Sequence, residues 1–295
     1  MISEKDKIDV SNGADLARYR GPDDTKFITG SCYAFGTNRL AIQSIKFGFQ
    51  PIENKRYILG FNGEIFNFFD LKKLFNYEVK SEVELILGLF EKFKEKFVEK
   101  IKGQFAIYIY DKLDGALYLF RDRFGIRPIY FCTNSNKNFI FSSEIKSILL
   151  VSEQNHSVSK MSLAQNAMFW TNIGTMTSFE KIKILPPNSY LKLDKEMNLK
   201  VKTYENYFFL KKNVNNDLNL YELLENSVKK QIFGEVGFCS YLSGGIDSSI
   251  IAFLLNKISK SPIDTFSISF RDKAYDESAA QKKVAHFLKS NHYSI

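Results

Sequence analysis

The sequence predicts two units of different fold class, an α+β unit built on an antiparallel sheet and then a parallel α/β unit. Pairs of strand-like runs joined by turn residues recur over the first two-thirds of the chain. Helix-like and strand-like runs alternate after residue 219. A polar, asparagine-rich stretch at 213–219 lies between the two patterns and is typical of a linker. We therefore expect domains at residues 1–212 and 213–295.

Three hairpins are expected in the first unit. Asn62-Gly63 separates strand-like runs at 57–61 and 64–66, and this dipeptide favours a two-residue turn because both positions accept positive φ. The other two hairpins are expected from strands at 105–110 and 116–120, and from strands at 129–133 and 139–142. Several of these strands are almost continuously apolar, which predicts a sheet covered on both faces.

Helices are expected to cover this sheet. Apolar residues recur at helical spacing between Val83 and Ile101 and predict one amphipathic helix. A further helix is expected at 162–170. A strand is expected at 189–193, after the turn at 185–188.

The second unit follows the pattern of a parallel α/β sheet. Helices are expected at 220–233, 247–258 and 277–288, and buried strands at 236–242 and 263–270. Ile250 and Ile251 belong to the apolar side of the middle helix. Two strands cannot bury a sheet by themselves, so we expect the chain to stop inside a domain.

Composition excludes several classes of protein. Of the 295 residues, 44% are hydrophobic and 25% are charged, which excludes collagen-like and disordered chains. The net charge of +8 is spread thinly and favours a solvated basic surface over a nucleic-acid-binding one.

The sequence shows no signal peptide and no apolar run long enough to cross a membrane. The three cysteines, Cys32, Cys132 and Cys239, lie too far apart to predict a metal site or a disulfide framework. We expect a cytoplasmic protein without nucleic-acid or membrane partners.

The strongest chemical signal is the segment Ser243–Ser249, with sequence SGGIDSS, between a predicted strand and a predicted helix. Glycines let several backbone N–H groups approach one ligand, and a helix start favours phosphate. The serines add hydroxyl donors, and Asp247 can hold Mg²⁺ that bridges phosphate oxygens. No lysine follows the glycines, which excludes the loop of γ-phosphate-transferring NTPases. The alternative is a capped glycine turn without a ligand.

This segment resembles the pyrophosphatase loop of ATP-dependent amidoligases, which split ATP into AMP and pyrophosphate. The strand Thr265–Phe270 resembles the strand whose backbone faces adenine in those enzymes, although a plain core strand explains it equally well. The resemblance implies ATP and Mg²⁺ as cofactors, with Asp247 holding the metal through pyrophosphate. The implied ATP-binding residues are Leu242, Ser243, Gly244, Gly245, Asp247, Ser248, Ser249 and Ile268.

Five further motifs precede the loop in a fixed order: Arg20–Asp24, Asn38–Ile42, Phe61–Asn67, Arg121–Pro128 and Phe141–Lys146. Together the six motifs resemble the glutamine-hydrolysing asparagine synthetases. The resemblance implies an N-terminal-nucleophile glutaminase domain, a four-layer αββα sandwich, followed by a doubly wound ATP-pyrophosphatase domain. It implies synthesis of asparagine from aspartate through β-aspartyl-AMP, with glutamine as the ammonia donor. Glutamine, aspartate and ATP are the implied partners, and a homodimer is compatible with the family.

Carried over by position, Arg39 would bind the glutamine carboxylate, and Asn62 with the Gly63 N–H would form the oxyanion hole. The implied glutamine-binding residues are Arg39, Leu40, Ala41, Ile42, Asn62, Gly63, Glu64 and Glu82. Alternatives stay open at two places, because Arg39 could be a surface strand residue and Asn62-Gly63 could be only a turn. Arg121–Pro128 is expected to be a structural ion-pair loop.

The sequence departs from the family pattern in three ways. The family nucleophile is a cysteine directly after the initiator Met, whereas this chain begins Met1-Ile2-Ser3, and the first strand that follows that cysteine is not recognisable. Glu82 stands where the family carries Asp. The later parts of the ATP site would lie past Ile295. We therefore expect the chain as given to be an incomplete, inactive version of the enzyme.

Two alternative functions stay open. The first is an amidoligase relative without glutaminase activity, either β-lactam synthetase-like or ammonia-using. The second is a non-catalytic remnant that binds glutamine or a nucleotide.

Overall fold

A computed structural model describes residues 2–152, 157–204, 219–232, 234–259 and 261–295. The chain divides into two compact units, Met1–Leu210 and Lys211–Ile295. The asparagine-rich stretch expected to be the linker lies outside the described residues, apart from Asn219.

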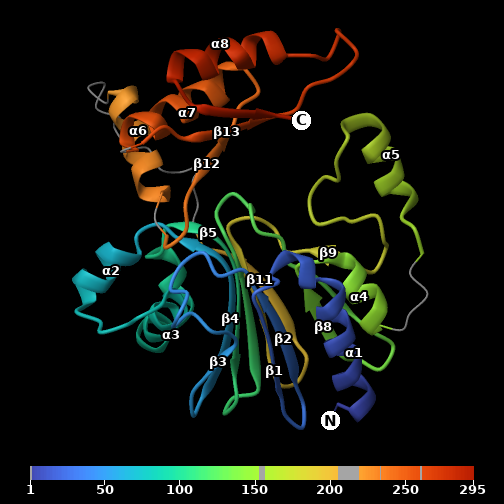
Figure 1. The fold of residues 1–295 in the computed structure, drawn as a ribbon. Helices are drawn as coiled ribbons and strands as arrows, with labels where there is room; N and C mark the ends of the chain where they lie inside the picture. Colours follow the sequence, from blue (N-terminus) through green and yellow to red (C-terminus); the bar gives the residue numbers. More distant parts are fainter. Residues whose placement is uncertain (1, 153–156, 205–218, 233, 260) are drawn as a thin grey trace. The chain divides into compact units, whose positions relative to one another are not determined.

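The first unit is built on a six-stranded antiparallel sheet in the order β11-β10-β6-β5-β4-β3 (Figure 1). These strands are β3 (Ile52–Glu53), β4 (Tyr57–Ile65), β5 (Gly103–Asp111), β6 (Ala116–Arg121), β10 (Ser189–Leu193) and β11 (Leu199–Thr203). All six residues of β6 are buried, because both faces of this sheet are covered. The predicted hairpin of 105–110 with 116–120 and the predicted strand at 189–193 are confirmed.

Helices cover one face of this sheet. They are α2 (Phe68–Phe75), α3 (Glu82–Phe93) and the short 3₁₀-helix η2 (Lys94–Glu99). Ser81 caps α3 by accepting a hydrogen bond from the Glu84 N–H, and Leu85 and Leu89 are fully buried against the strands. The prediction of one helix over 83–101 was wrong in extent, because Lys94 takes φ +50° and ends α3 there.

A second sheet layer covers the opposite face. It consists of the hairpin β1 (Asp24–Thr29) with β2 (Ala34–Arg39), and of a three-stranded sheet in the order β8-β7-β9. The latter strands are β7 (Tyr130–Thr133), β8 (Phe139–Ser142) and β9 (Lys183–Ile184), so the predicted hairpin of 129–133 with 139–142 is confirmed. Phe35, Leu119 and Phe131 belong to one buried cluster that joins the two layers.

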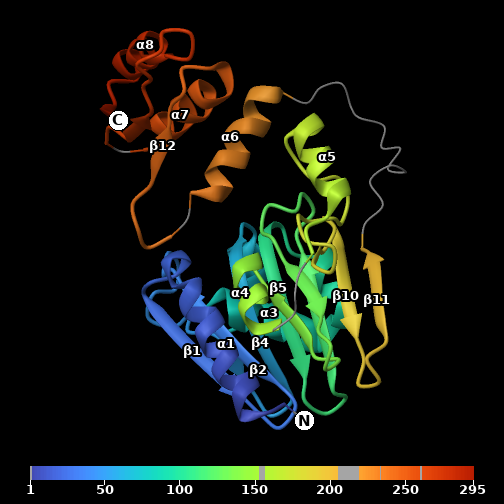
Figure 2. The same ribbon diagram turned by 90° about the vertical axis from the view of Figure 1, so that its right-hand side faces the viewer.

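Two helices form the outer layer on this side, α1 (Glu4–Leu16) and α4 (Ile145–Ser152), and they pack against each other (Figure 2). The short 3₁₀-helix η1 (Arg18–Arg20) follows α1. The expected four-layer αββα sandwich is therefore confirmed. A separate helix, α5 (Lys160–Phe169), confirms the prediction at 162–170.

The hairpin predicted at Asn62-Gly63 was wrong. Both residues lie inside β4, which pairs with β5 without interruption from Tyr57 to Ile65. Gly63 has φ +147°, and a Cβ atom there would stand 1.9 Å from the Gln104 carbonyl oxygen. The glycine is required for close approach of two strands rather than for a turn.

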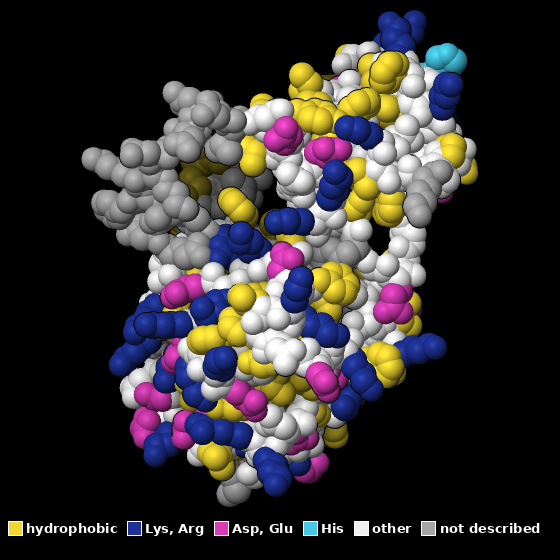
Figure 3. Space-filling view, turned by 90° about the vertical axis from the view of Figure 1, so that its left-hand side faces the viewer, with side chains coloured by type: hydrophobic (Ala, Val, Ile, Leu, Met, Phe, Trp, Pro, Cys, Tyr) yellow, Lys and Arg dark blue, Asp and Glu magenta, His cyan; other side chains and the backbone are white. Residues whose placement is uncertain are grey.

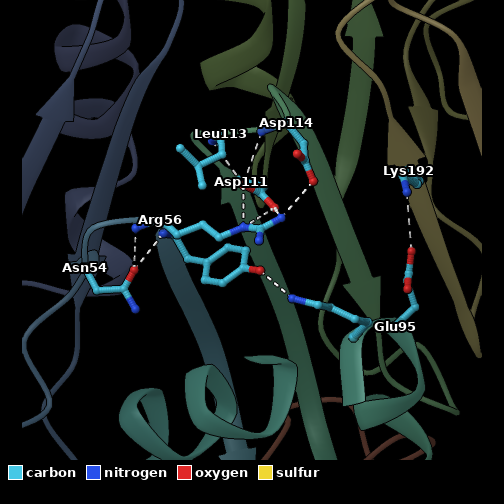
Figure 4. Close-up of polar contacts among 9 residues, drawn as sticks. Asn54, Arg56, Glu95, Asp111, Leu113, Asp114 and Lys192 are labelled. Atoms are coloured by element: carbon cyan, nitrogen blue, oxygen red, sulfur yellow. Dashed lines mark hydrogen bonds and ion pairs between the residues drawn. The ribbon is translucent and has the colours of Figure 1, made fainter. Parts of the chain in front are cut away.

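The turn between β5 and β6 is held by an ion-pair cluster (Figure 4). Asp111 is 3% exposed and receives two hydrogen bonds from Arg56 Nε and one of 2.7 Å from its Nη2. The Leu113 N–H donates to the same carboxylate. Burial is the largest single influence on the pKa of Asp111 and raises it, but the bonds from Arg56 and from the Asp114 and Leu113 N–H groups together hold this pKa below its usual range. The Leu113 and Asp114 N–H groups that donate to Asp111 are local in the sequence, whereas Arg56 is remote from this turn.

The second unit is a parallel sheet in the order β12-β13-β14, as the alternating pattern predicted. Its strands are β12 (Cys239–Tyr241), β13 (Asp264–Ser267) and β14 (Asn291–Ser294), and its helices are α6 (Leu220–Gln231), α7 (Ile246–Ile258) and α8 (Ser278–Leu288). The third strand, β14, was missed because its sequence, Asn-His-Tyr-Ser, is polar.

The expectation of a buried strand at 236–242 was wrong in extent and in burial. Strand 236–242 is shorter than predicted and partly open, with Val236 47% exposed. Ile250 and Ile251 are 38% and 41% exposed, whereas Leu254 and Leu255 of the same helix are buried. The apolar side of α7 is therefore only partly covered by the described residues.

Charges of both signs are interspersed over the face of the molecule shown in Figure 3. That face carries no broad single-sign patch, in agreement with a thinly spread positive charge. Among the described residues, no helix has the length and apolar character needed to span a bilayer.

Candidate functional site

A cavity of about 1000 Å³ lies inside the first unit. It is lined by residues of both sheet layers and of the helices α1 and α4. It brings together all but one of the sequence-predicted glutamine-binding residues: Arg39, Leu40, Ile42, Asn62, Gly63, Glu64 and Glu82. Ala41 is the exception, and its N–H donates a 2.8 Å hydrogen bond to Asp23. The cavity thus collects residues from β2, β4 and the start of α3.

Arg39 is a buried residue, 6% exposed, at the end of β2, so the surface-strand alternative was wrong. Its guanidinium donates hydrogen bonds of 3.1, 3.3 and 2.8 Å to the carbonyls of Ile45, Gln43 and Ser44. It also lies over the Phe49 ring, 5.3 Å from the centroid. These contacts fix the loop after β2 and use three of the five guanidinium N–H donors.

Two carboxyl groups meet in the cavity. Glu82, in the first turn of α3, is 7% exposed, and its Oε1 accepts a 2.6 Å hydrogen bond from the Ile65 N–H. Glu64 Oε2 is buried and has no hydrogen-bond partner among the described residues. The cavity therefore has an unsatisfied acceptor beside a second acid.

Both acids hold their protons more tightly than usual. Burial raises the pKa of Glu64 to about 7, and the neighbouring Arg127 opposes part of this rise. Burial raises the pKa of Glu82 to about 8, with the Glu64 carboxylate adding to the rise and the Ile65 N–H opposing it. Two neighbouring buried carboxyls resist double ionisation, so this part of the cavity favours a cationic ligand group.

This pair makes the stability of the first unit depend on pH. A folded-state pKa raised above the ordinary 4.5 gives stability that is complete below pH 4.5 and is lost as the pH rises towards 8. We expect Glu82→Gln, which keeps the acceptor for the Ile65 N–H, to weaken this loss by roughly 1 kcal/mol per pH unit. Thermal unfolding followed between about pH 5 and pH 8 measures the slope.

The control for this prediction is Glu91→Gln, on the exposed side of the same helix, where Oε1 accepts only from Asn54 in the described contacts. Its pH slope should equal that of the parent chain. Equal slopes for Glu82→Gln and the parent would contradict the assignment of the titration to the buried pair.

In the Arg121–Pro128 loop, the described contacts of Arg121 and Asp122 are hydrogen bonds between these side chains and backbone groups. The Arg121 guanidinium donates to the carbonyls of Gly125, Arg127 and Leu185. Asp122, 1% exposed, accepts from four backbone N–H groups, those of Phe105, Phe124, Ile126 and Arg127. One ion pair does connect two of the sequence motifs, Arg20 with Glu144 at 2.7 Å.

In the second unit, the glycine loop follows β12 and leads into α7, whose N-cap is Gly245. Gly244 has φ +83°, and a Cβ atom there would stand 2.8 Å from the Ala280 Cβ. The loop is ordered by its own hydroxyls, with Ser243 Oγ 2.9 Å from Ser248 Oγ and Ser249 Oγ donating to the Gly245 carbonyl. A glycine with this conformation at a helix start is suited to a phosphate group.

The other predicted ATP-binding residues surround the same sheet edge. Leu242 is buried directly after β12, and Ile268 follows β13, so both stand at the carboxyl ends of parallel strands, where ligands bind in α/β folds. Asp247 is exposed in the first turn of α7. Within the described ranges, no cluster of three or more metal-ligating side chains occurs, so Asp247 fits Mg²⁺ only together with phosphate oxygens.

Sequence reasoning did not single out Gln281. This residue is 2% exposed, its Nε2 donates a 3.1 Å hydrogen bond to the Ile268 carbonyl, and its backbone N borders Gly244. It therefore connects the two segments of the candidate nucleotide site. No sequence signal distinguishes it from other polar residues of an amphipathic helix.

A four-layer sandwich with a buried polar cavity, followed by a parallel α/β unit with a glycine loop, defines a two-unit protein of the amidotransferase class. The chain belongs to the glutamine amidotransferase domain family, which it matches over residues 2–205. Residues 219–295 match the asparagine synthase family.

Named relatives match almost the whole chain. Asparagine synthetase [glutamine-hydrolyzing] 1 of Bacillus subtilis is 31% identical over 90% of this chain and 43% of the relative. Asparagine synthetase [glutamine-hydrolyzing] 3 of the same organism is 30% identical over 95% and 48%. A putative asparagine synthetase [glutamine-hydrolyzing] 2 of Methanocaldococcus jannaschii is 30% identical over 98% and 61%. The chain thus spans about half the length of these relatives.

Solved structures overlap less closely. The glutamine phosphoribosylpyrophosphate amidotransferase from Bacillus subtilis aligns with a TM-score of 0.43 and 14% identity, over 88% of this chain and 51% of that one. An allosteric regulatory enzyme of purine biosynthesis aligns with a TM-score of 0.45 and 12% identity, over 88% and 75%. The family assignment does not depend on these overlaps.

Proposed function

We propose that this chain is part of a glutamine-dependent asparagine synthetase, with a glutaminase domain at 1–212 and the first part of the ATP-binding domain at 213–295. The observation that carries the proposal is the pairing, in one chain, of the Arg39–Glu64–Glu82 cavity with a glycine loop at the carboxyl ends of parallel strands. The relatives named above carry the same activity in their names.

In the glutaminase domain, each charged end of glutamine has a complementary group. Arg39 takes the α-carboxylate through its remaining N–H donors, and the Glu64–Glu82 pair takes the α-ammonium. Asn62 and the Gly63 N–H receive the oxyanion that forms when the side-chain amide is attacked. Leu40 and Ile42 border the carboxylate end of the substrate, whereas Ala41 lies outside the cavity lining.

In the second domain, the loop from Ser243 to Ser249 holds the phosphates of ATP. Its backbone N–H groups and serine hydroxyls donate to phosphate oxygens, and Asp247 is the residue that would hold Mg²⁺. The bound metal would supply charge neutralisation at the phosphate oxygens. Leu242 and Ile268 border the nucleotide, and Gln281 fixes the Ile268 carbonyl.

The complete reaction joins the two domains chemically. Glutamine and water give glutamate and ammonia, while aspartate and ATP give β-aspartyl-AMP and pyrophosphate. Ammonia then displaces AMP to form asparagine. We place this reaction in the cytoplasm, with ATP, Mg²⁺, glutamine and aspartate as the small-molecule partners.

The proposal is tested on the intact protein isolated from its source, after its mass and N-terminal sequence are measured. We expect a mass well above 34.1 kDa, an N-terminal cysteine, and asparagine formed from aspartate, ATP and glutamine. Asp247→Ala should lower asparagine formation by roughly a hundredfold, because it removes the carboxylate that holds the metal on pyrophosphate. Chromatographic measurement of asparagine and glutamate reports both half-reactions.

Glu222→Ala, an exposed carboxylate at the start of α6, is the matched control and should leave the rate unchanged. Normal turnover in Asp247→Ala would remove the metal assignment. Amidation with ammonia but not with glutamine would replace the proposal by an amidoligase without glutaminase activity. An intact mass of 34.1 kDa without either activity would support a non-catalytic binding protein.

A further inference from the structure

The ladder between β12 and β13 ends one hydrogen bond before the glycine loop. Tyr241 lies beside Phe266, and the Leu242 N–H still donates a 2.8 Å hydrogen bond to the Phe266 carbonyl. In a parallel ladder the next bond would join the Ile268 N–H to the Leu242 carbonyl. Instead, the Leu242 carbonyl accepts from the Ser267 hydroxyl, and the Ile268 N–H has no partner among the described contacts. The described residues therefore leave a backbone donor unpaired at the carboxyl end of β13.

The carbonyl of the same residue is held by a side chain of α8, which packs against β13 (Figure 1). Gln281 is 2% exposed, and its Nε2 donates a 3.1 Å hydrogen bond to the Ile268 carbonyl. At the other end of this peptide unit, the Ser269 N–H donates a 2.8 Å hydrogen bond to the Ile295 carbonyl. The peptide unit between Ile268 and Ser269 is thus fixed at both of its polar groups. A carbonyl oxygen has two lone pairs, so the Ile268 carbonyl can accept one more hydrogen bond.

The side chain of Gln281 carries an energetic cost. Its Oε1 is buried and has no hydrogen-bond partner among the described residues. An unpaired buried amide oxygen is destabilising, and an apolar side chain of the same length would fill this position without that penalty. The residue also lies against the glycine loop, because a Cβ atom on Gly244 would stand 2.9 Å from the Gln281 backbone nitrogen. The amide is therefore better explained by the carbonyl that it orients than by packing.

Ile268 presents a donor and an acceptor on one edge of the strand. In a parallel sheet the N–H and C=O of one residue point towards the same neighbouring strand, here the side of β12. Ile268 is 64% exposed, so a ligand can reach this edge. A ring with an acceptor atom next to an amino group complements the pair, and N1 and the 6-amino group of adenine have this arrangement. Guanine and hypoxanthine carry an N1–H and a 6-oxo group, which would place donor against donor and acceptor against acceptor.

We propose that Gln281 is a positioning residue for purine selectivity. By fixing the Ile268 carbonyl, it makes the nucleotide site accept a 6-aminopurine and reject a 6-oxopurine. The inference rests on the proposed function, because it places the base of a nucleotide at this edge. Gln281 acts through the carbonyl and does not have to touch the nucleotide. Without its amide, the peptide unit can turn the carbonyl oxygen away from a 6-oxo group, and the two classes of purine are no longer distinguished.

Titration calorimetry of the intact protein with the magnesium salts of ATP and ITP tests this inference. The two nucleotides share the sugar and the phosphates and differ at position 6 and N1 of the base. We expect the parent protein to bind ATP roughly thirtyfold more tightly than ITP. In Gln281→Met, which keeps the length and removes the amide, this ratio should fall to about threefold, with a melting temperature close to that of the parent. In the parent, ATP should also slow hydrogen exchange at the Ile268 amide.

Gln231→Met is the matched control, because Gln231 is an exposed glutamine at the end of α6 whose amide donates to the Ser227 hydroxyl. Its ratio of affinities should equal that of the parent. An unchanged ratio in Gln281→Met, with ATP and ITP weakened equally or not at all, would show a purely structural role and overturn the inference. Equal binding of ATP and ITP by the parent would overturn it too, whether or not asparagine is formed. A parent protein that binds neither nucleotide would contradict the proposed function, and this inference with it.

Discussion

Replacing Gly63 by alanine should strongly destabilise the first unit. The new Cβ would stand 1.9 Å from the Gln104 carbonyl oxygen and 2.8 Å from the Phe105 Cα, and both are backbone atoms that cannot rotate away. The residue also has φ +147°, which an L side chain rarely adopts. Strain of about 1–3 kcal/mol and overpacking of about 1–3 kcal/mol together give a loss of roughly 4 kcal/mol. That is a large share of the free energy that stabilises a typical domain.

Thermal unfolding measures this loss, and a decrease in the melting temperature of about 10 °C is expected. Gly88→Ala is the matched control. Gly88 lies within α3, its new Cβ would stand 3.4 Å from the Tyr77 ring, and alanine favours helix, so stability should stay equal or rise slightly. A Gly63→Ala chain as stable as the parent would mean that β4 and β5 can separate locally at little cost.

Removing the Asp122 carboxylate should destabilise the same unit to a similar extent. Four backbone N–H groups would lose their acceptor at once, at a residue that is 1% exposed. Hydrogen bonds to a charged acceptor contribute about 1.5–3 kcal/mol each, but their losses overlap when one loop relaxes. For Asp122→Ala we expect roughly 3–5 kcal/mol, the larger values applying if water cannot reach the loop.

Asp122→Asn separates the loss of acceptors from the loss of volume. It keeps one of two acceptor oxygens, each of which serves two N–H groups, so its destabilisation should be intermediate. Asp194→Ala is the control, because the Asp194 carboxylate accepts from Asn198 and from the Glu196 N–H within a single turn. Denaturant unfolding of the three variants gives the comparison. Equal midpoints for Asp122→Ala and Asp194→Ala would show that the loop is not held by its aspartate.

Local signals explain where sequence reasoning was correct. The β5–β6 hairpin was predicted because Asp111 and Gly115 carry the turn by themselves, the first accepting from nearby N–H groups and the second taking φ +65°. Helix α1 was missed, although its start was readable in the capping box formed by Ser3 and Asp6. Cys32 lies exposed in the connection between β1 and β2.

Distant pairing explains where the same reasoning failed. Asn62-Gly63 has the residues of a tight turn, yet nine consecutive residues of β4 pair with β5, about 40 positions further along the chain. The preference of Asn-Gly for a turn contributes about 1 kcal/mol, which is less than the free energy gained from nine residues of buried strand pairing. The dipeptide therefore became part of a strand, and its glycine became a place of close backbone approach.

The sequence by itself determined the order of the two fold classes and the glycine loop at the start of a helix, because both depend on spacing and residue type along the chain. The family resemblance supplied the glutamine-binding residues, and all of them but Ala41 line the cavity. Only the tertiary structure decided what surrounds them. Arg39 is bound to three loop carbonyls, and Glu64 and Glu82 share a buried space that raises the pKa of both. Burial and the distance between charges arise from packing of elements remote in sequence, and no local pattern records them.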